Sequence, residues 1–264
     1  MTQSAAVSLE SPTLLRSHAG GIATLTLNRP KQYNALSDAL LAELQQALDA
    51  ISQDEATRVV VIAGSGPAFC AGHDLKEMRA HYEQTKVRDL FAQCSQMMMS
   101  ITQLPQPVIA RVHGIATAAG CQLVAQCDLA VASASARFAT SGIDVGLFCS
   151  TPAVALSRNV SRKQAMEMLL TGDFIDAPTA LAQGLVNRVV VADKLDDEVL
   201  RLANAIKAKP PASIAMGKKL FYQQADTGMA EAYSMAAAVM ACNFMHEEAA
   251  EGVDAFIQKR PPRW

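Results

Sequence analysis

The chain has 264 residues, of which 50% are hydrophobic and 18% are charged, and its formal net charge is −2. This length and composition predict one large folded domain, or one domain with an appendage, and exclude a largely disordered chain. The near balance of charge provides no broad basic face, so we expect no nucleic-acid partner.

The first predicted elements alternate between strand and helix. IATLTL (22–27) is β-branched and apolar and predicts a strand, which LNRPKQYN interrupts. A helix follows, because Ser37 is a favourable N-cap and leucines recur at helical spacing after it. RVVVIAG (58–64) predicts a buried strand, and a long helix is predicted over residues 84–103.

The alternation continues toward residue 195. PVIARV (107–112) and DLAVAS (128–133) predict strands, and HGIATAAGCQLVAQ between them predicts a loop and a small-residue helix. SRKQAMEMLLTG (161–172) and APTALAQG predict short helices that end at glycine.

The last predicted strand is NRVVV (187–191), and every later segment is helical. We therefore predict an α/β core over residues 1–195 and a helical region over residues 196–264. The helix at 229–246 is rich in alanine and methionine, which suits either an oligomer interface or packing within the chain.

Cysteine usage and the N-terminus bear on location. The six cysteines form no C-x-x-C pair, which is typical of free thiols in a reducing compartment. MTQSAAVSLESPTLL lacks the basic and apolar parts of a secretory signal, and no apolar run approaches the roughly 18 residues of a membrane span. We therefore expect a cytoplasmic protein without membrane contact.

Several functional motifs are incomplete. GSGPAF (64–69) begins like a dinucleotide fingerprint but lacks its third glycine, and HEEAA (246–250) lacks the second histidine of a zinc protease. His73 and Asp74 are adjacent on an extended segment and point in opposite directions, so they rarely share one ion. We expect no metal site.

Small residues at 70–72 and 116–120 let another group approach the main chain closely. In the second segment, ATAAGC opens a helix, whose first N–H groups have no internal partner. N–H groups from two such loops can form an oxyanion hole, in which each donor is worth about 3 kcal/mol in the transition state. From composition alone, the alternative that these small residues serve tight packing is favoured over an oxyanion hole.

Two blocks, AFCAGHDLKEM (68–78) and VHGIATAAGCQLVAQCDLAVAS (112–133), resemble the signatures of the crotonase (enoyl-CoA hydratase/isomerase) superfamily. LNRPKQYNAL, AMEMLLTGDFIDAPTALAQGLVNRVV and DAFIQKR extend the resemblance along nearly the whole chain. GCQLVAQCD and FATSGIDVGLFCSTPAVAL look most similar to the enoyl-CoA hydratase domain-containing protein 3 group.

The resemblance implies an α/β fold, a crotonase-like spiral of β-β-α turns with a C-terminal helical trimerisation region. It implies a homotrimer or a dimer of trimers that acts on an acyl-CoA thioester. Coenzyme A would enter as part of the substrate, with no separate cofactor. The oxyanion-hole N–H groups would belong to His73 and Ala119.

The resemblance also implies contacts to coenzyme A, whose phosphates suit lysine partners. The positions that match such contacts near the nucleotide are Lys31, Ala35, His73, Asp74, Leu75 and Lys76. In the tail, Phe256 and Lys259 match positions that reach the ligand of a neighbouring subunit.

The chain departs from the hydratase pattern at both glutamates that share the acid and base work. Gln122 and Gly142 stand at these positions, and neither side chain can take a proton from water. Asp144 is either a substitute acid or a loop residue, and Cys149 is a weaker candidate nucleophile. We interpret His113 as structural.

We therefore expect an enoyl-CoA hydratase/isomerase-type enzyme, a lyase or isomerase of fatty acid metabolism, that stabilises a thioester enolate. The alternatives are another acyl-CoA enzyme, such as a thioesterase or decarboxylase, and a non-catalytic acyl-CoA binder.

Overall fold

The computed structural model describes residues 12–264, so most of the segment behind the prediction about a secretory signal lies outside the described residues. A six-stranded sheet has the order β1-β2-β3-β5-β7-β10, in which β1 is antiparallel to β2 and the other neighbours are parallel. Its strands are β1 (Leu14–Ala19), β2 (Ile22–Leu27), β3 (Val59–Gly64), β5 (Val108–Val112), β7 (Leu129–Ser133) and β10 (Arg188–Val190).

A smaller, four-stranded sheet has the order β4-β6-β8-β9, with β4, β6 and β8 parallel and β9 antiparallel. Its strands are β4 (Ala68–Cys70), β6 (Ile115–Thr117), β8 (Arg137–Ala139) and β9 (Ile175–Asp176). The chain places a strand in the large sheet, then one in the small sheet, then a helix, three times in succession. The predicted spiral of β-β-α turns is confirmed.

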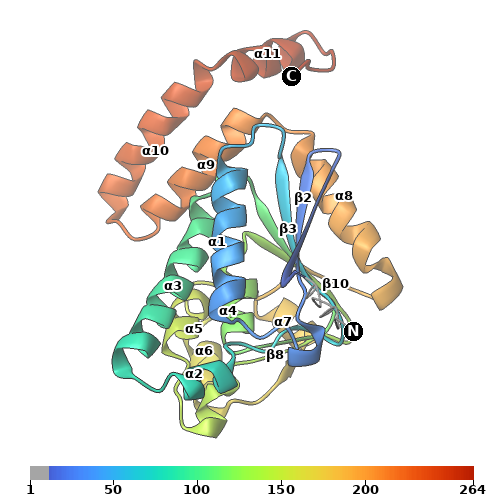
Figure 1. Cartoon of the computed structure of the whole chain (residues 1–264). Coiled ribbons are helices and arrows are strands. Elements are labelled where there is room, and N and C mark those ends of the chain that lie inside the picture. Colours follow the sequence, from blue (N-terminus) through green and yellow to red (C-terminus); the bar gives the residue numbers. More distant parts are fainter. Residues whose placement is uncertain (1–11) are drawn as a thin grey trace, which may run out of the picture.

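Helices surround both sheets (Figure 1). The helices of the body are α1 (Asp38–Ser52), α2 (Leu75–Ala80), α3 (Gln84–Gln103), α4 (Ala119–Gln126), α5 (Ser150–Leu156), α6 (Arg162–Thr171) and α7 (Ala177–Ala182). The later helices are α8 (Leu195–Lys207), α9 (Pro211–Gln224), α10 (Met229–Phe244) and α11 (Glu247–Ile257), and short 3-10 turns are η1 (Pro30–Gln32), η2 (Ser141–Val145) and η3 (Ala192–Lys194).

The large sheet is buried on both faces. Along β3, Val60 and Ile62 join the main core, which also includes α1 and α3, whereas Val59 and Val61 face a second cluster with α8. This alternation follows from the two-residue period of a strand. Because α8 covers a sheet face, the helix just after the predicted division at residue 195 packs on the core; the division itself stays a prediction.

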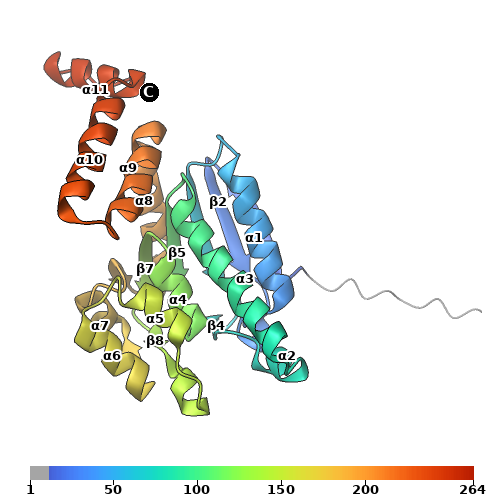
Figure 2. The ribbon, with the colours of Figure 1, turned by 90° about the vertical axis from the view of Figure 1, so that its left-hand side faces the viewer.

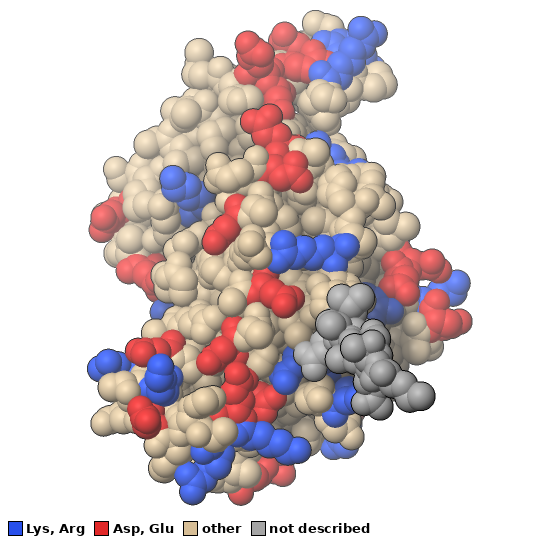
Figure 3. Space-filling model, viewed as in Figure 1, with Lys and Arg blue, Asp and Glu red and all other residues tan. Residues whose placement is uncertain are grey.

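The last helices extend from the body. Helix α9 packs beside α3, and α10 and α11 continue away from the sheets (Figures 1 and 2). Acidic and basic side chains are interspersed over the viewed face, and a broad uncharged area lies over α9 and α10 (Figure 3). No helix in the described part of the chain is long and apolar enough to cross a membrane.

Candidate active site

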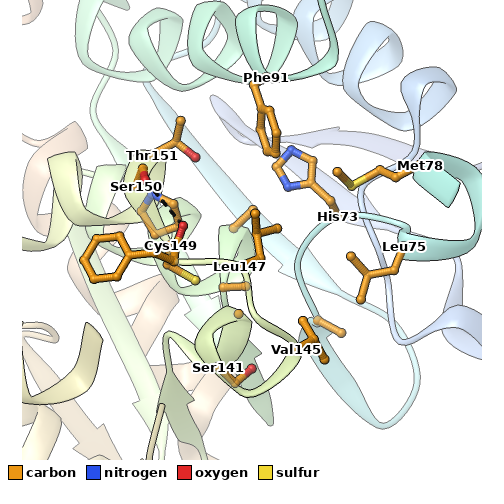
Figure 4. A pocket seen from close by; sticks show the side chains of 16 residues that line it. His73, Leu75, Met78, Phe91, Ser141, Val145, Leu147, Cys149, Ser150 and Thr151 are labelled. Atoms are coloured by element: carbon orange, nitrogen blue, oxygen red, sulfur yellow. Dashed lines mark hydrogen bonds between the residues drawn. The ribbon is translucent and has the colours of Figure 1, made fainter. Parts of the chain in front are cut away.

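Three loops meet at one edge of the small sheet. Strands β4, β6 and β8 are parallel neighbours, so their carboxyl ends and the loops that follow lie on the same side. Residues from all three loops line a cavity of about 390 Å³ (Figure 4). The topology therefore brings His73, Ala119 and Gly142 to one place, although they are far apart in sequence.

The first two loops touch at Gly72. This residue has a φ of +93°, and an added Cβ would lie 2.9 Å from the Cβ of Ala118 and 3.3 Å from the backbone nitrogen of Ala119. Within residues 12–264, neither the N–H of His73 nor that of Ala119 donates a hydrogen bond to the protein. Two unpartnered main-chain donors thus stand close together at the cavity wall, as an oxyanion hole requires.

The start of α4 is packed tightly against β4. An added Cβ at Gly120 would lie only 2.0 Å from the carbonyl oxygen of Cys70, so this position excludes any side chain. Ala118, the residue before the helix, has φ +50° and ψ −121°, a conformation that glycine adopts more easily. This backbone conformation precedes the Ala119 N–H directly.

A clamp from the 29–36 loop holds the His73 loop. Leu36 donates its N–H to Gly72 O at 2.7 Å, and Asp74 donates its N–H to Leu36 O at 3.0 Å. The fully buried Asn34 side chain donates to Ser65 O and Ala68 O at 2.8 Å each. The clamp therefore fixes both ends of the segment that carries His73.

An ion pair completes this clamp. Arg29 donates to the carboxylate of Asp74 at 2.9 Å and also to the carbonyl of Ala35. Burial raises the pKa of Asp74, but the bonds from Arg29 and from the N–H groups of Glu77 and Lys76 outweigh it, so its pKa lies below the ordinary value. Asp74 is thus a structural carboxylate and the N-cap of α2.

The His73 imidazole lines the cavity beside Phe91, with ring centres 5.2 Å apart (Figure 4). Burial lowers the pKa of His73 to about 4, and Asp38 offsets this effect only in part. The ring is therefore neutral at physiological pH. In the described part of the chain, no group of three or more His, Cys, Asp or Glu is placed to hold a metal ion.

Most of the cavity wall is apolar, which suits an acyl chain. The large apolar side chains in the wall are Leu75, Met78, Phe91, Val145, Leu147, Phe148 and Pro152. Sequence reasoning missed most of these residues, because an apolar residue that faces a cavity has the same spacing as one that faces the core. The wall contains no carboxylate and no lysine or arginine among the described residues.

The two positions that the resemblance matches to the hydratase glutamates differ in surroundings. Gln122 is buried on α4, and its Oε1 has no hydrogen-bond partner in the described residues. Gly142 lines the cavity, but an added Cβ would lie 2.4 Å from Leu147 O and 2.8 Å from the Sγ of Cys149. The space beside Gly142 is therefore already filled.

The structure does not favour either further candidate, Asp144 as a catalytic acid or Cys149 as a nucleophile. The carboxylate of Asp144 lies against Gly172, where an added Cβ would be 2.9 Å from its Oδ1, and Asp144 is not in the cavity wall. We therefore leave Asp144 out of the proposed catalytic groups. Cys149 does line the cavity, but burial raises its pKa, an effect that the N–H of Gly142 only partly offsets.

His113 lies outside the cavity wall, and its Nε2–H donates a hydrogen bond of 2.9 Å to Gly66 O. Burial lowers its pKa, and the nearby Arg111 contributes in the same direction. This environment agrees with the structural interpretation of His113.

The residues predicted to contact coenzyme A divide into two groups. Lys31 and Lys76 are exposed, and Leu75 is half exposed and lines the cavity. In contrast, Ala35 is buried, and the main chain of Asp74 is engaged at both its N–H and its carbonyl. The N–H of Asp74 is thus already used, so a main-chain contact to adenine would have to use the second lone pair of the Asp74 carbonyl oxygen.

Phe256 and Lys259 lie at the far end of the molecule. They belong to α11 and the turn after it, whereas the cavity lies near α2 and α5 (Figures 1 and 2). Within one chain the structure does not bring them to the cavity. Their predicted contact with a neighbouring subunit's ligand stays a prediction.

Comparison with known proteins identifies the family that this chain matches. The model of the enoyl-CoA hydratase/isomerase family matches residues 17–264. The mitochondrial enoyl-CoA hydratase domain-containing protein 3 of Rattus norvegicus is 45% identical over 92% of this chain and 81% of its own length. This agrees with the group indicated by the sequence blocks.

Solved structures agree over the full fold. An enoyl-CoA hydratase from Mycobacterium smegmatis has a TM-score of 0.95 and 59% identity, and covers 96% of this chain and 99% of that one. Human enoyl coenzyme A hydratase domain-containing protein 3 has a TM-score of 0.93 and 43% identity, with 96% and 100% coverage.

The names of similar relatives contradict the predicted cytoplasmic location. Enoyl-CoA hydratase domain-containing protein 3 is called mitochondrial in rat, mouse, frog and human. The prediction was wrong because it rested only on the lack of a secretory signal and of a membrane span. Mitochondrial targeting depends on a different, amphipathic pattern.

Proposed function

Because the chain belongs to the enoyl-CoA hydratase/isomerase family, we propose that it binds acyl thioesters of coenzyme A and acts on them. In this proposal the thioester oxygen accepts hydrogen bonds from the N–H groups of His73 and Ala119. The acyl chain occupies the apolar cavity, and the exposed Lys31 and Lys76 lie near the phosphates.

The observation that carries this proposal is the contact between Gly72 and the Ala118–Ala119 segment. This contact supports the proposal because it brings the loop that carries the His73 N–H against the backbone nitrogen of Ala119, and within residues 12–264 neither N–H donates to the protein. Such donors stabilise the negative oxygen of a thioester enolate, and each is worth about 3 kcal/mol in a transition state. The proposed chemistry is therefore removal of a proton beside the thioester carbonyl.

Hydration should be slow in this protein. It needs a base to activate water and an acid to protonate carbon, and loss of one such group costs about 10²–10⁴ in rate. The described cavity wall holds no carboxylate, so isomerase-type chemistry through the enolate is favoured over hydration. The same lack of carboxylates favours, as a second candidate, a non-catalytic acyl-CoA binder.

A substitution at Gly72 tests the proposed site. In Gly72→Ala, the new methyl group would press on Ala118 and separate the two donors, so acyl-CoA affinity should fall at least tenfold. Gly20→Ala is a matched control, because Gly20 also has a positive φ but an added Cβ there meets only Lys207 at 3.7 Å.

Calorimetric titration with octanoyl-CoA measures both variants, and thermal unfolding verifies that each is folded. Retained affinity in a folded Gly72→Ala protein would refute the two-donor site. Turnover of crotonyl-CoA then separates the candidates, since a binder forms no product. Hydration at rates typical of enzymes, a kcat of about 1–10³ per second, would contradict the slow hydration proposed above.

A further inference from the structure

Only two side chains in the described cavity wall can ionise, His73 and Cys149. We propose that the imidazole of His73 is the catalytic base, which moves a proton between acyl carbons while the backbone N–H of the same residue holds the thioester oxygen. This inference rests on the proposed function, because it needs a thioester bound between His73 and Ala119.

The position of the ring supports this role. The imidazole lies at the cavity between Phe91 and Met78 (Figure 4). Its Nε2 atom is buried and has no hydrogen-bond partner in residues 12–264, which leaves Nδ1 as the nitrogen that can face a bound acyl chain. A thioester oxygen held by the His73 N–H places its neighbouring carbon close to the side chain of the same residue.

The chemical step needs one base and no water. The Nδ1 lone pair takes a proton from C2 of a 3-enoyl thioester, and the electrons of that C–H bond form the enolate at the oxyanion hole. The imidazolium then returns the same proton to C4, and the double bond moves to C2–C3. Atoms and charge balance, and no oxidant or second substrate is needed.

The basicity of the ring is adequate for this step. Burial lowers the pKa of His73 to about 4, close to the value of about 4.6 of the aspartate that abstracts a carbon-bound proton in ketosteroid isomerase. The imidazole is thus in its basic form throughout the neutral range. Cys149, whose pKa burial raises, remains a protonated thiol and cannot replace it.

Deuterium exchange tests the base without requiring the natural substrate. The intact protein is incubated with octanoyl-CoA in D₂O, and mass spectrometry measures deuterium at C2. We expect exchange by the parent protein and a loss of at least 100-fold in His73→Phe, which keeps the backbone N–H but not the base. His81→Phe is the matched control, because His81 is exposed at the end of α2 and lies outside the cavity wall.

Conversion of 3-hexenoyl-CoA to 2-hexenoyl-CoA is measured with the same variants and should follow the same order. Calorimetry must show that His73→Phe still binds octanoyl-CoA. Lost exchange is then due to removal of the base and not to loss of substrate binding. Exchange that survives in His73→Phe, or a parent protein that binds octanoyl-CoA without exchange, would overturn the role of His73. No binding by the parent would instead refute the proposed function.

Discussion

Ala118 holds the backbone in a conformation that suits glycine. Its φ of +50° and ψ of −121° bring the Cβ close to its own backbone, which costs about 1–3 kcal/mol for a residue with a side chain. The strained residue, Ala118, directly precedes Ala119, whose N–H we assign to the oxyanion hole. Strain of this kind persists only where surrounding contacts hold the conformation.

Ala118→Gly should therefore stabilise the protein. Relief of the strain outweighs the greater flexibility of glycine in the unfolded chain, and we expect a net gain of about 1 kcal/mol. Urea unfolding measures the change. A loss of stability would mean that the methyl contacts of Ala118 in the wall outweigh its backbone strain.

His73 makes stability depend on pH. Its pKa is lowered from 6.5 to about 4 by burial, with Asp38 acting weakly in the opposite direction. Between these values the unfolded chain binds a proton that the folded chain does not, so the free energy of unfolding falls as pH falls from 6.5 to 4. The stability that depends on a neutral His73 is fully present above pH 6.5.

Replacement of His73 by Phe should remove this dependence. In urea unfolding at several pH values, the parent should lose stability relative to His73→Phe as the pH falls from 6.5 to 4. His113, whose pKa is also lowered, is present in both proteins and cancels from the difference. Curves that stay parallel would contradict the buried neutral imidazole.

At the scale of elements, a mostly buried charge cluster joins α9 to the body. Lys218, only 7% exposed, donates to Asp128 at 2.6 Å and to the carbonyls of Ile101 and Gln106. Asp128 also accepts from Tyr222 at 2.8 Å. One lysine on α9 therefore bonds acceptors from the end of α3, the loop before β5 and the residue before β7.

Lys218→Met should destabilise the protein far more than Tyr222→Phe. The first substitution leaves the mostly buried Asp128 carboxylate without its counter-charge, although Val108 N–H and Tyr222 still donate to it, and removes the lysine donor from two carbonyls, which costs about 3–5 kcal/mol. The second removes one hydrogen bond to Asp128, worth about 1 kcal/mol. Urea unfolding compares the two, and equal losses would show that the ion pair contributes little beyond packing.

Most long elements could be predicted from sequence, as could the short helix α7 and the last strand β10, but several other short strands could not. The strand at 22–27 and the helix at 84–103 occur where periodicity placed them, and Ser37 caps α1 through a bond from Leu40 N–H. Strands β4, β6 and β8 were missed because three residues are too few to show a period. Strand β1 was missed because most of its residues are exposed.

The candidate site was harder to predict for a different physical reason. Main-chain donors have no side-chain signature, so the roles of His73 and Ala119 came from the family resemblance and not from residue chemistry. For Asp144 the side chain was visible in the sequence but its direction was not. The spacing placed an acid two residues after Gly142, but it could not show that η2 turns this carboxylate toward Gly172.

At the scale of the whole molecule, the last two helices expose many large apolar side chains. The exposed residues on α10 and its C-cap are Met229, Tyr233, Met240, Phe244 and Met245, and those on α11 include Phe256 and Ile257. A contiguous apolar surface on an isolated chain is costly in water and is typical of an interface. We therefore expect the predicted homotrimer, or dimer of trimers, to cover these helices.

Two charges on α10 should dissociate this assembly. Met240 and Phe244 are four residues apart and share a helix face, so Met240→Glu with Phe244→Glu places two carboxylates in the interface. Sedimentation velocity should show assembled parent protein and a monomeric variant. Acyl-CoA affinity should fall as well if Phe256 and Lys259 reach a neighbour's ligand. Tyr82→Glu, an exposed aromatic before α3, is the control; a monomeric parent would refute the interface.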